Sequence, residues 1–439
     1  MMDGSPKWFR FSNTQSLQVF HLLRQGAMIG TSVLLAKSRL TVADIGAYEL
    51  LMYLAYTLSF WWVTGLAQGI LTKYPRLAAI EQKQLIFNGY LLFLSISTLL
   101  FVLLWGFPNT ALQWLTGQTE IRFFDILLIF ALLNFPTFLL ENYLLLQNKS
   151  QQIIIYGSIA AILQPIVVII PVWLGLDFQW SIIGLVVLAA FKHSWLFVNV
   201  WQNGSWQLNI PLLKNIIYLS LPLVAYSLLG GFNVAFDNWL VNFHYNGDPV
   251  QFAIFRYGAQ ELPLTLALTN ALGTALLPDI AKNLSESLSA IKTKSLRLFH
   301  LLFPLTIVII LTDRWLFPIL FNPNFIASVP IFNVYLLILI SRLVFARSVL
   351  VGLQANRQVL VISVIELIIN ALLSFWLVQY WGMVGIAVGT LIAYSVEKIL
   401  LCAYLYVRFG VPMGAYTDIK WFVIYNTLLI SAFFITFLY

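Results

Sequence analysis

The sequence predicts an all-α polytopic membrane protein with about thirteen transmembrane helices, within a range of twelve to fourteen. Three observations lead to this fold class: 60% of the 439 residues are hydrophobic, only 9% are charged, and the mean hydropathy is +0.87. Soluble domains carry about 25% charged residues, so a soluble chain of this composition would lack the polar surface that keeps it dispersed. The net charge of +7 is spread over short loops, which favours basic loops on one membrane face over nucleic-acid binding.

Apolar stretches of bilayer length recur along the whole chain. A bilayer core takes about 20 mainly apolar residues per helix. We therefore expect spans at residues 17–36, 45–71, 85–107, 123–147, 153–174, 181–201, 212–236, 250–277, 298–320, 329–353, 358–379, 383–407 and 421–438.

The distribution of Lys and Arg predicts the orientation. With the N-terminus inside, the outer loops carry only Lys37, Arg39, Arg122 and Arg314, and the other loop cations fall on the inner side. This asymmetry follows the positive-inside rule and predicts a cytoplasmic N-terminus.

An internal repeat relates the two halves of the chain. The segment LLQNKSQQI (145–153) is similar to GLQANRQVL (352–360), and WSIIGLVVLAA (180–190) is similar to WGMVGIAVGTL (381–391). Six spans separate equivalent positions, and an even number of crossings preserves orientation, so the repeats are parallel. We expect a six-helix lobe over residues 1–208, a second over 209–407, and an additional helix within 408–439. Transporters commonly place a substrate site between two such halves.

Three arginines in the spans are candidate substrate residues. Arg342 lies near the middle of the tenth span, Arg24 about two turns into the first, and Arg256 a similar distance into the eighth. An ionisable group in a span is costly unless it faces a cavity or a partner. Together the three could line a wet, cationic cavity that attracts a diphosphate. The alternative is that each pairs with a carboxylate or with carbonyls at a helix end.

Other charged residues in the spans suggest gating, coupling or structural roles. Glu141 and Arg347 lie at similar depth on repeat-related spans and could pair across the halves as a gate. Asp237 and Glu261 could carry a coupling proton or sodium ion, although Asp237 is read more simply as a residue of the outer interface. We expect Glu366 and Lys398, at similar depth on consecutive spans, to form a structural ion pair.

Motifs for a chemical reaction are missing from the sequence. There is no phosphate-binding loop for ATP hydrolysis, the four histidines form no metal set, and no large extramembrane domain could hold a catalytic site. We therefore expect a transporter and not an enzyme, without metal or cofactor, driven by H⁺ or Na⁺ coupling or by consumption of its product.

The chain resembles the multidrug/oligosaccharidyl-lipid/polysaccharide (MOP) exporter superfamily, in particular its Wzx-type O-antigen flippase branch. The resemblance covers nearly the whole chain and rests on four segments: RQGAMIG (24–30), GTALLPDIAKN (273–283), GLQANRQ (352–358) and WGMVGIAVGTLIA (381–393). It implies a V-shaped, MATE-like pair of lobes around a cationic central cavity. Arg24, by its place in the first span, is similar to the cavity arginines of related lipid flippases.

The resemblance further implies a function and its partners. It implies alternating access that moves a polyprenyl-diphosphate-linked oligosaccharide, destined for lipopolysaccharide or another surface polysaccharide, across the bacterial inner membrane. Membrane lipids, a polysaccharide polymerase and glycosyltransferases are the expected partners, and nucleic acid is not. Two alternatives stay open: a cation-coupled multidrug exporter of the same fold, and a membrane polysaccharide polymerase or ligase, which the short outer loops disfavour.

Overall fold

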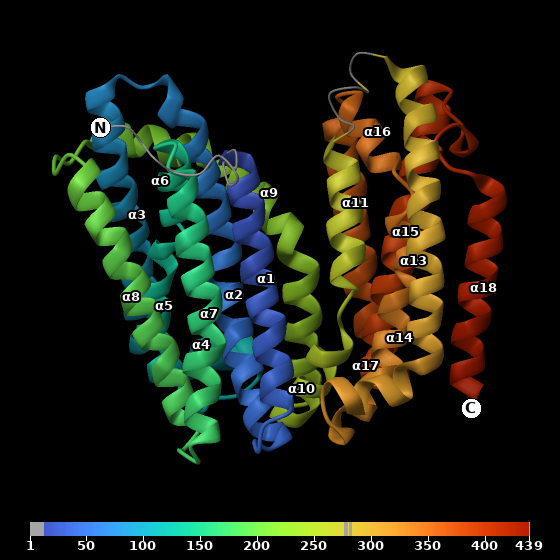
Figure 1. The fold of residues 1–439 in the computed structure, drawn as a ribbon, viewed down its shortest axis with the longest axis horizontal. Helices are drawn as coiled ribbons and strands as arrows, with labels where there is room; N and C mark the ends of the chain where they lie inside the picture. Colours follow the sequence, from blue (N-terminus) through green and yellow to red (C-terminus); the bar gives the residue numbers. More distant parts are fainter. Residues whose placement is uncertain (1–12, 276–279, 281–282, 439) are drawn as a thin grey trace, which may run out of the picture. The chain divides into compact units, whose positions relative to one another are not determined.

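The computed structural model describes residues 13–275, 280 and 283–438, and within these every regular element is a helix (Figure 1). The end of the eighth predicted span and part of the 273–283 segment therefore lie outside the described residues. The first helices are α1 (Asn13–Ala36), α2 (Val42–Lys73), α3 (Ala79–Gly106), α4 (Pro108–Thr116), α5 (Phe124–Thr137), α6 (Leu140–Leu146), α7 (Ser150–Trp173), α8 (Gln179–Asn203) and α9 (Ile210–His244). The others are α10 (Pro249–Gly258), α11 (Pro263–Ala275), α13 (Leu284–Leu320), α14 (Val329–Leu337), α15 (Leu339–Arg342), α16 (Ala346–Gly352), α17 (Asn356–Phe409) and α18 (Ile419–Leu438).

The number of spans agrees with the prediction. Eleven of the described helices are long and apolar enough to cross a membrane. One of these, α17, consists of two helices that meet at Gly382, and the eighth predicted span is divided into α10 and α11 by residues 259–262. The prediction of an all-α, polytopic protein with about thirteen transmembrane helices is confirmed.

The chain forms two compact units, Met1–Gly231 and Phe232–Tyr439, which we call unit 1 and unit 2. In unit 1, α1 packs along α7, and α5 packs against α3 and α8. In unit 2, α17 packs against α14 and α16, and α18 packs against α13. The division falls inside α9, whereas the lobe boundary predicted at 208/209 falls just before this helix and stays a prediction.

The long helix α17 is a hairpin that turns at Gly382. This residue has φ 54° and ψ −139°, a backbone conformation that is open to glycine and strained for other residues. The two arms are in contact. The hydroxyl of Ser374, before the turn, donates to the carbonyl of Ile386, after the turn, at 3.3 Å. A Cβ atom on Gly389 would lie 2.8 Å from the backbone nitrogen of Ser374, so the close approach of the arms depends on glycine.

We expect Gly389→Ala to destabilise the protein by about 1–3 kcal/mol, because the added methyl group must push one arm of the hairpin away from the other. Thermal unfolding of the purified protein measures the effect. Gly26→Ala is the matched control: a Cβ at Gly26 would meet nothing within 4 Å, and alanine in a helix is favoured over glycine by about 0.5–1 kcal/mol. Equal unfolding temperatures for the two variants would contradict the packing of the hairpin.

The predicted repeat is visible in matching turns of the two units. Asn148 and Gln354 both have positive φ, at 57° and 61°. After each, the next backbone N–H bonds back to a carbonyl of the preceding helix at 2.9 Å, from Lys149 to Leu144 and from Ala355 to Leu350. The structure thus pairs Asn148 with Gln354, one residue away from the match of Gln147 with Gln354 in the sequence.

Candidate functional site

Unit 2 contains a buried carboxylate, Asp237, which receives hydrogen bonds from neutral groups. Asp237 is 2% exposed. Its Oδ2 accepts from the hydroxyls of Thr390 at 2.8 Å and Tyr335 at 3.2 Å, and its Oδ1 accepts from Asn370 Nδ2 at 3.3 Å. We call Asp237, Tyr335, Asn370 and Thr390 the Asp237 cluster. Asp237 is thus buried among α9, α14 and α17. Its place at the outer interface, which concerns depth in the membrane, stays a prediction.

Several oxygen atoms converge at the Asp237 cluster. The Thr390 hydroxyl lies 3.2 Å from Asn370 Oδ1 and 3.1 Å from the carbonyl of Ile386. Ser374 donates to Asn370 Oδ1 at 2.9 Å. Carboxylate, amide, hydroxyl and carbonyl oxygens are the ligands that hard cations prefer. The donor set therefore fits a Na⁺ ion, and a proton on Asp237 would neutralise the same charge.

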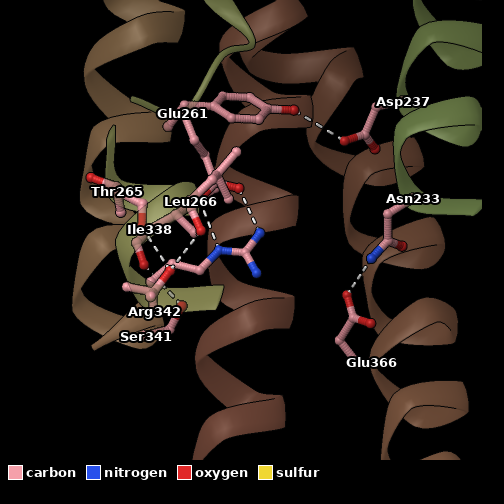
Figure 2. Close-up of polar contacts among 11 residues, drawn as sticks. Asn233, Asp237, Glu261, Thr265, Leu266, Ile338, Ser341, Arg342 and Glu366 are labelled. Carbon is pink, nitrogen blue, oxygen red and sulfur yellow. Dashed lines mark hydrogen bonds and ion pairs between the residues drawn. The ribbon is translucent and has the colours of Figure 1, made fainter. Parts of the chain in front are cut away.

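Glu366 joins this cluster through an amide. Asn233 donates from Nδ2 to Glu366 Oε1 at 2.7 Å (Figure 2), and its Oδ1 accepts from Asn370 Nδ2 at 3.2 Å. The expected ion pair between Glu366 and Lys398 is not formed among the described residues. Similar depth does not fix which face of a helix a residue occupies, since each residue turns the helix by about 100°.

Arg342 and Glu261 form a bidentate ion pair within unit 2 (Figure 2). Arg342 Nε and Nη2 lie 2.8 and 2.6 Å from the two carboxylate oxygens of Glu261, and the guanidinium carbon lies 5.0 Å from the ring centre of Tyr394. The paired state, one of the two that the sequence left open, is therefore the one observed for Arg342. The same contact engages Glu261, so this carboxylate is less suited than Asp237 to hold a coupling ion.

The ion pair sits where two spans lose their helical structure. Glu261 lies in the interruption between α10 and α11, and Arg342 is the last residue of α15. A cavity of about 10 Å³, the size of one water molecule, is lined by Glu261 and Tyr335 among others. Interrupted backbone at membrane depth is tolerated where it is buried in protein or lines a water-filled space. The pair and the Asp237 cluster thus share one polar region.

Arg347 has partners within its own unit. Its Nη2 forms an ion pair with Glu397 and donates to the hydroxyl of Ser363 at 2.7 Å. Glu141, the partner expected from the sequence, belongs to unit 1, where the charged residues that act on it are Arg24 and Lys192. The pairing of Arg347 with Glu141 as a gate between the halves stays a prediction.

Arg24 in α1 is an exposed guanidinium held by aromatic rings. Its guanidinium carbon lies 5.8 Å from the ring centre of Phe20 and 5.7 Å from that of Phe138, within the range of cation–π attraction. In the described part of the chain no carboxylate lies within 4 Å of it. Glu141, which is 5% exposed, interacts with both Arg24 and Lys192 at longer range, so the group of three carries a net positive charge.

Arg256, the third candidate cation, lies in the last turn of α10 and is half-buried. Its carbonyl accepts a hydrogen bond from Gln260 at 3.0 Å, and the residue has a further interaction within the structure. Its contact with a substrate stays a prediction.

The neutral residues in and around the Asp237 cluster were missed in the sequence. Asn233 precedes Asp237 by four residues on α9, and Asn370 precedes Ser374 by four on α17. Residues four apart share a helix face. A search for polar pairs at this spacing in apolar helices would have found Asn233, Asn370 and Ser374, whereas a search for charges alone does not.

Solved structures with the same fold include a lipid flippase and multidrug transporters. The chain is similar to the lipid II flippase MurJ in an inward closed conformation, with a TM-score of 0.69 and 15% identity over 95% of this chain and 97% of that one. It is similar to an inward-facing multidrug resistance MATE family transporter of the MOP superfamily, with a TM-score of 0.61 and 12% identity over 93% and 100% of the chains. A mutant of the Vibrio cholerae MATE transporter VcmN has a TM-score of 0.55 and 16% identity over 90% and 99%.

Neither a protein-family model nor a curated protein sequence matches the chain. The likeness to the solved structures extends over almost the full length of each. The protein is a multi-pass membrane protein with the fold that the lipid II flippase and the MATE transporters of the MOP superfamily share.

Proposed function

We propose that the protein is a flippase that moves a polyprenyl-diphosphate-linked oligosaccharide across the bacterial inner membrane by alternating access. The observation that carries the proposal is Arg24, an exposed guanidinium within a membrane span that has no carboxylate within 4 Å in the described residues. A charge in this position is costly unless it faces water or an anion. Guanidinium groups match phosphate oxygens in charge and in hydrogen-bond geometry, so a diphosphate headgroup is the fitting ligand.

The charge of unit 1 favours an anionic substrate over a cationic drug. Arg24 and Lys192 outnumber Glu141, the carboxylate on which both act, and a net positive site repels organic cations. The solved structure with the highest TM-score given above is that of a lipid II flippase, which supports a lipid-linked substrate. Arg256 is a second proposed anion contact.

We further propose that Asp237 binds the coupling ion, Na⁺ or H⁺. Two observations support this. The Asp237 carboxylate is buried and accepts hydrogen bonds from uncharged groups, and several other oxygen atoms lie close to it. A buried carboxylate is strongly stabilised when a cation or a proton neutralises it, so occupancy of the site would favour one conformation of unit 2. A shift of this equilibrium is the means by which an ion gradient drives transport.

We expect Na⁺ to raise the unfolding temperature of the purified protein by on the order of 2–4 °C relative to choline, because a ligand that binds only the folded state stabilises it. Asp237→Asn should abolish this shift. Asp125→Asn, which changes an exposed carboxylate on α5, is the matched control and should keep it. A pH-dependent shift lost in Asp237→Asn would assign a proton instead. If Na⁺ and pH change the unfolding temperature of the wild type and of Asp237→Asn equally, Asp237 does not bind the coupling ion.

Two cellular phenotypes separate the flippase from the multidrug exporter. Deletion of the gene should cause lipid-linked oligosaccharide to accumulate in the membrane and surface polysaccharide to be lost, with unchanged drug susceptibility. Increased drug susceptibility with normal polysaccharide would favour the exporter. As a flippase the protein would act after the glycosyltransferases that assemble its substrate and before the polymerase that consumes it, with its N-terminus in the cytoplasm.

A further inference from the structure

Lys398 is a cation within a membrane span that has no partner in the described part of the chain. It is half-buried on the second arm of α17, and its ammonium group forms neither an ion pair nor a hydrogen bond with the described residues. A charge inside a span is costly unless it faces water, a partner or a ligand. Lys398 is therefore a candidate ligand contact, in place of the structural partner of Glu366 that the sequence suggested.

A second cation with free donors, Arg347, stands beside Lys398. Its Nη2 atom forms the ion pair with Glu397, the residue before Lys398, and donates to the hydroxyl of Ser363. Its Nε and Nη1 atoms donate to none of the described residues, and its side chain is 45% exposed. A guanidinium has five N–H donors and an ammonium has three, so most donors of these two cations are available to a ligand.

The charges around Lys398 favour an anionic ligand. The charged side chains that act on it are those of Glu397, Arg347 and Arg342. Arg342 is already neutralised by Glu261, and Glu397 is the partner of Arg347. The ammonium of Lys398 is thus an excess positive charge in this group, and an oxyanion that contacts both Lys398 and Arg347 would balance it.

Lys398 lies on a polar face of its helix. Tyr394 precedes it by four residues and shares this face, and the ring centre of Tyr394 lies 5.0 Å from the guanidinium carbon of Arg342. Ile399, an exposed apolar residue, lies about 100° around the helix. The polar and apolar faces of this arm are therefore separate, and Lys398 belongs to the one that also contacts Arg342.

The depth of Lys398 in its span distinguishes a transported lipid from an ordinary membrane lipid. The arm runs from residue 383 to Phe409, so Lys398 lies roughly 16 Å from the nearer end, at about 1.5 Å per residue. The hydrocarbon core is about 30 Å thick, which puts Lys398 near its middle. Resident phospholipids keep their phosphates at the two surfaces, whereas the diphosphate of a transported lipid must pass the middle.

We propose that Lys398 and Arg347 form a second anion site, which binds the diphosphate of the substrate while it crosses the membrane. The oxyanion contacts the ammonium of Lys398 and the free Nε and Nη1 donors of Arg347. Glu397 stays paired with Nη2 and limits the affinity by its negative charge, which favours release of the substrate. The site deepens the transport function proposed above and rests on it, but uses residues of unit 2 in addition to Arg24.

Titration of the purified full-length protein in neutral detergent tests the proposal, with farnesyl diphosphate as the polyprenyl diphosphate and phosphatidylglycerol as the membrane anion. We expect Lys398→Met to weaken farnesyl diphosphate binding about tenfold, the effect of losing one contact between charged groups, and to leave phosphatidylglycerol binding unchanged. The unfolding temperature should not fall, because Lys398 loses no partner. Lys398→Arg keeps the charge and should keep most of the affinity.

Two further variants complete the test. Lys420→Met removes an exposed cation from the first turn of α18 and is the matched control, which should bind both probes as the wild type does. Glu397→Gln removes the competing negative charge and should tighten farnesyl diphosphate binding several-fold. This gain of affinity keeps the proposal falsifiable if Lys398→Met does not fold.

Each other outcome has a definite meaning. Unchanged farnesyl diphosphate binding in Lys398→Met, or no tightening in Glu397→Gln, overturns the site. An equal loss of both probes in Lys398→Met means that any anionic lipid binds there, which also overturns it. If Arg24→Ala loses binding and Lys398→Met does not, only the second site fails. If the wild type binds farnesyl diphosphate through Lys398 but does not move the lipid-linked oligosaccharide, the transport function fails and the anion site stands.

Discussion

Arg24→Ala should reduce transport of the lipid-linked substrate by about 10- to 100-fold, since one or two charge-assisted hydrogen bonds to the diphosphate are lost. The same change should leave the stability within about 1 kcal/mol of wild type, because it breaks no ion pair among the residues that the structure describes. Loss of function without loss of stability is the signature of a ligand contact. The measurements are surface polysaccharide in a deletion strain that expresses the variant, and thermal unfolding of the purified protein.

Two further variants control for charge and for position. Arg24→Lys keeps the positive charge without the forked donor geometry and should restore part of the activity. Lys214→Ala removes an exposed cation from α9 of unit 1 and should be neutral. Full activity of Arg24→Ala at normal expression would remove this residue from the substrate path.

Arg342→Ala and Glu261→Ala should each destabilise unit 2 by about 1–3 kcal/mol, because each leaves a half-buried charge without its partner. Removing both charges together, in Arg342→Met/Glu261→Gln, should recover most of this loss. We expect the double variant to regain transport as well. Arg342 lies against Glu261, so if its role is to neutralise this carboxylate, it is no longer needed once Glu261 is replaced by Gln.

The double variant also decides between the two roles of Arg342. If it folds normally but does not transport, the guanidinium contacts the substrate in another conformation, as the sequence first suggested. Chemical unfolding and the surface-polysaccharide assay together give both results. Arg347→Gln breaks a different ion pair of the same unit and is the control. It shows whether the energetic dependence is specific to Arg342 and Glu261.

The fold could be predicted because it depends on composition and on patterns that repeat. The spans follow from hydropathy, and the parallel repeat follows from the turns after Gln147 and Leu353, which need little more than local sequence. The interruption around Glu261 could not be predicted in the same way. An apolar stretch reads as one helix whether or not tertiary contacts, such as the ion pair with Arg342, hold its backbone open.

The candidate site was predicted in part, for a physical reason. Charged residues are rare in spans, so Arg24, Asp237 and Arg342 stand out in the sequence. Their partners depend on which face each helix turns toward its neighbour, and an error of one residue rotates a side chain by about 100°. Depth alone therefore suggested Lys398 for Glu366, where the structure has Asn233. Neutral ligands such as Thr390 carry no signal until the helices are placed.

Reconstitution into vesicles tests directly whether the protein moves a lipid-linked diphosphate. Lipid-linked oligosaccharides that accumulate in the deletion strain are extracted, labelled on the sugar and incorporated into proteoliposomes. Exposure of the label to an external quencher then reports transbilayer movement. We predict movement well above that of protein-free vesicles for the wild-type protein, and a loss of most of it in Arg24→Ala. Movement equal to protein-free vesicles, in proteoliposomes that do transport a cationic dye, would contradict the account.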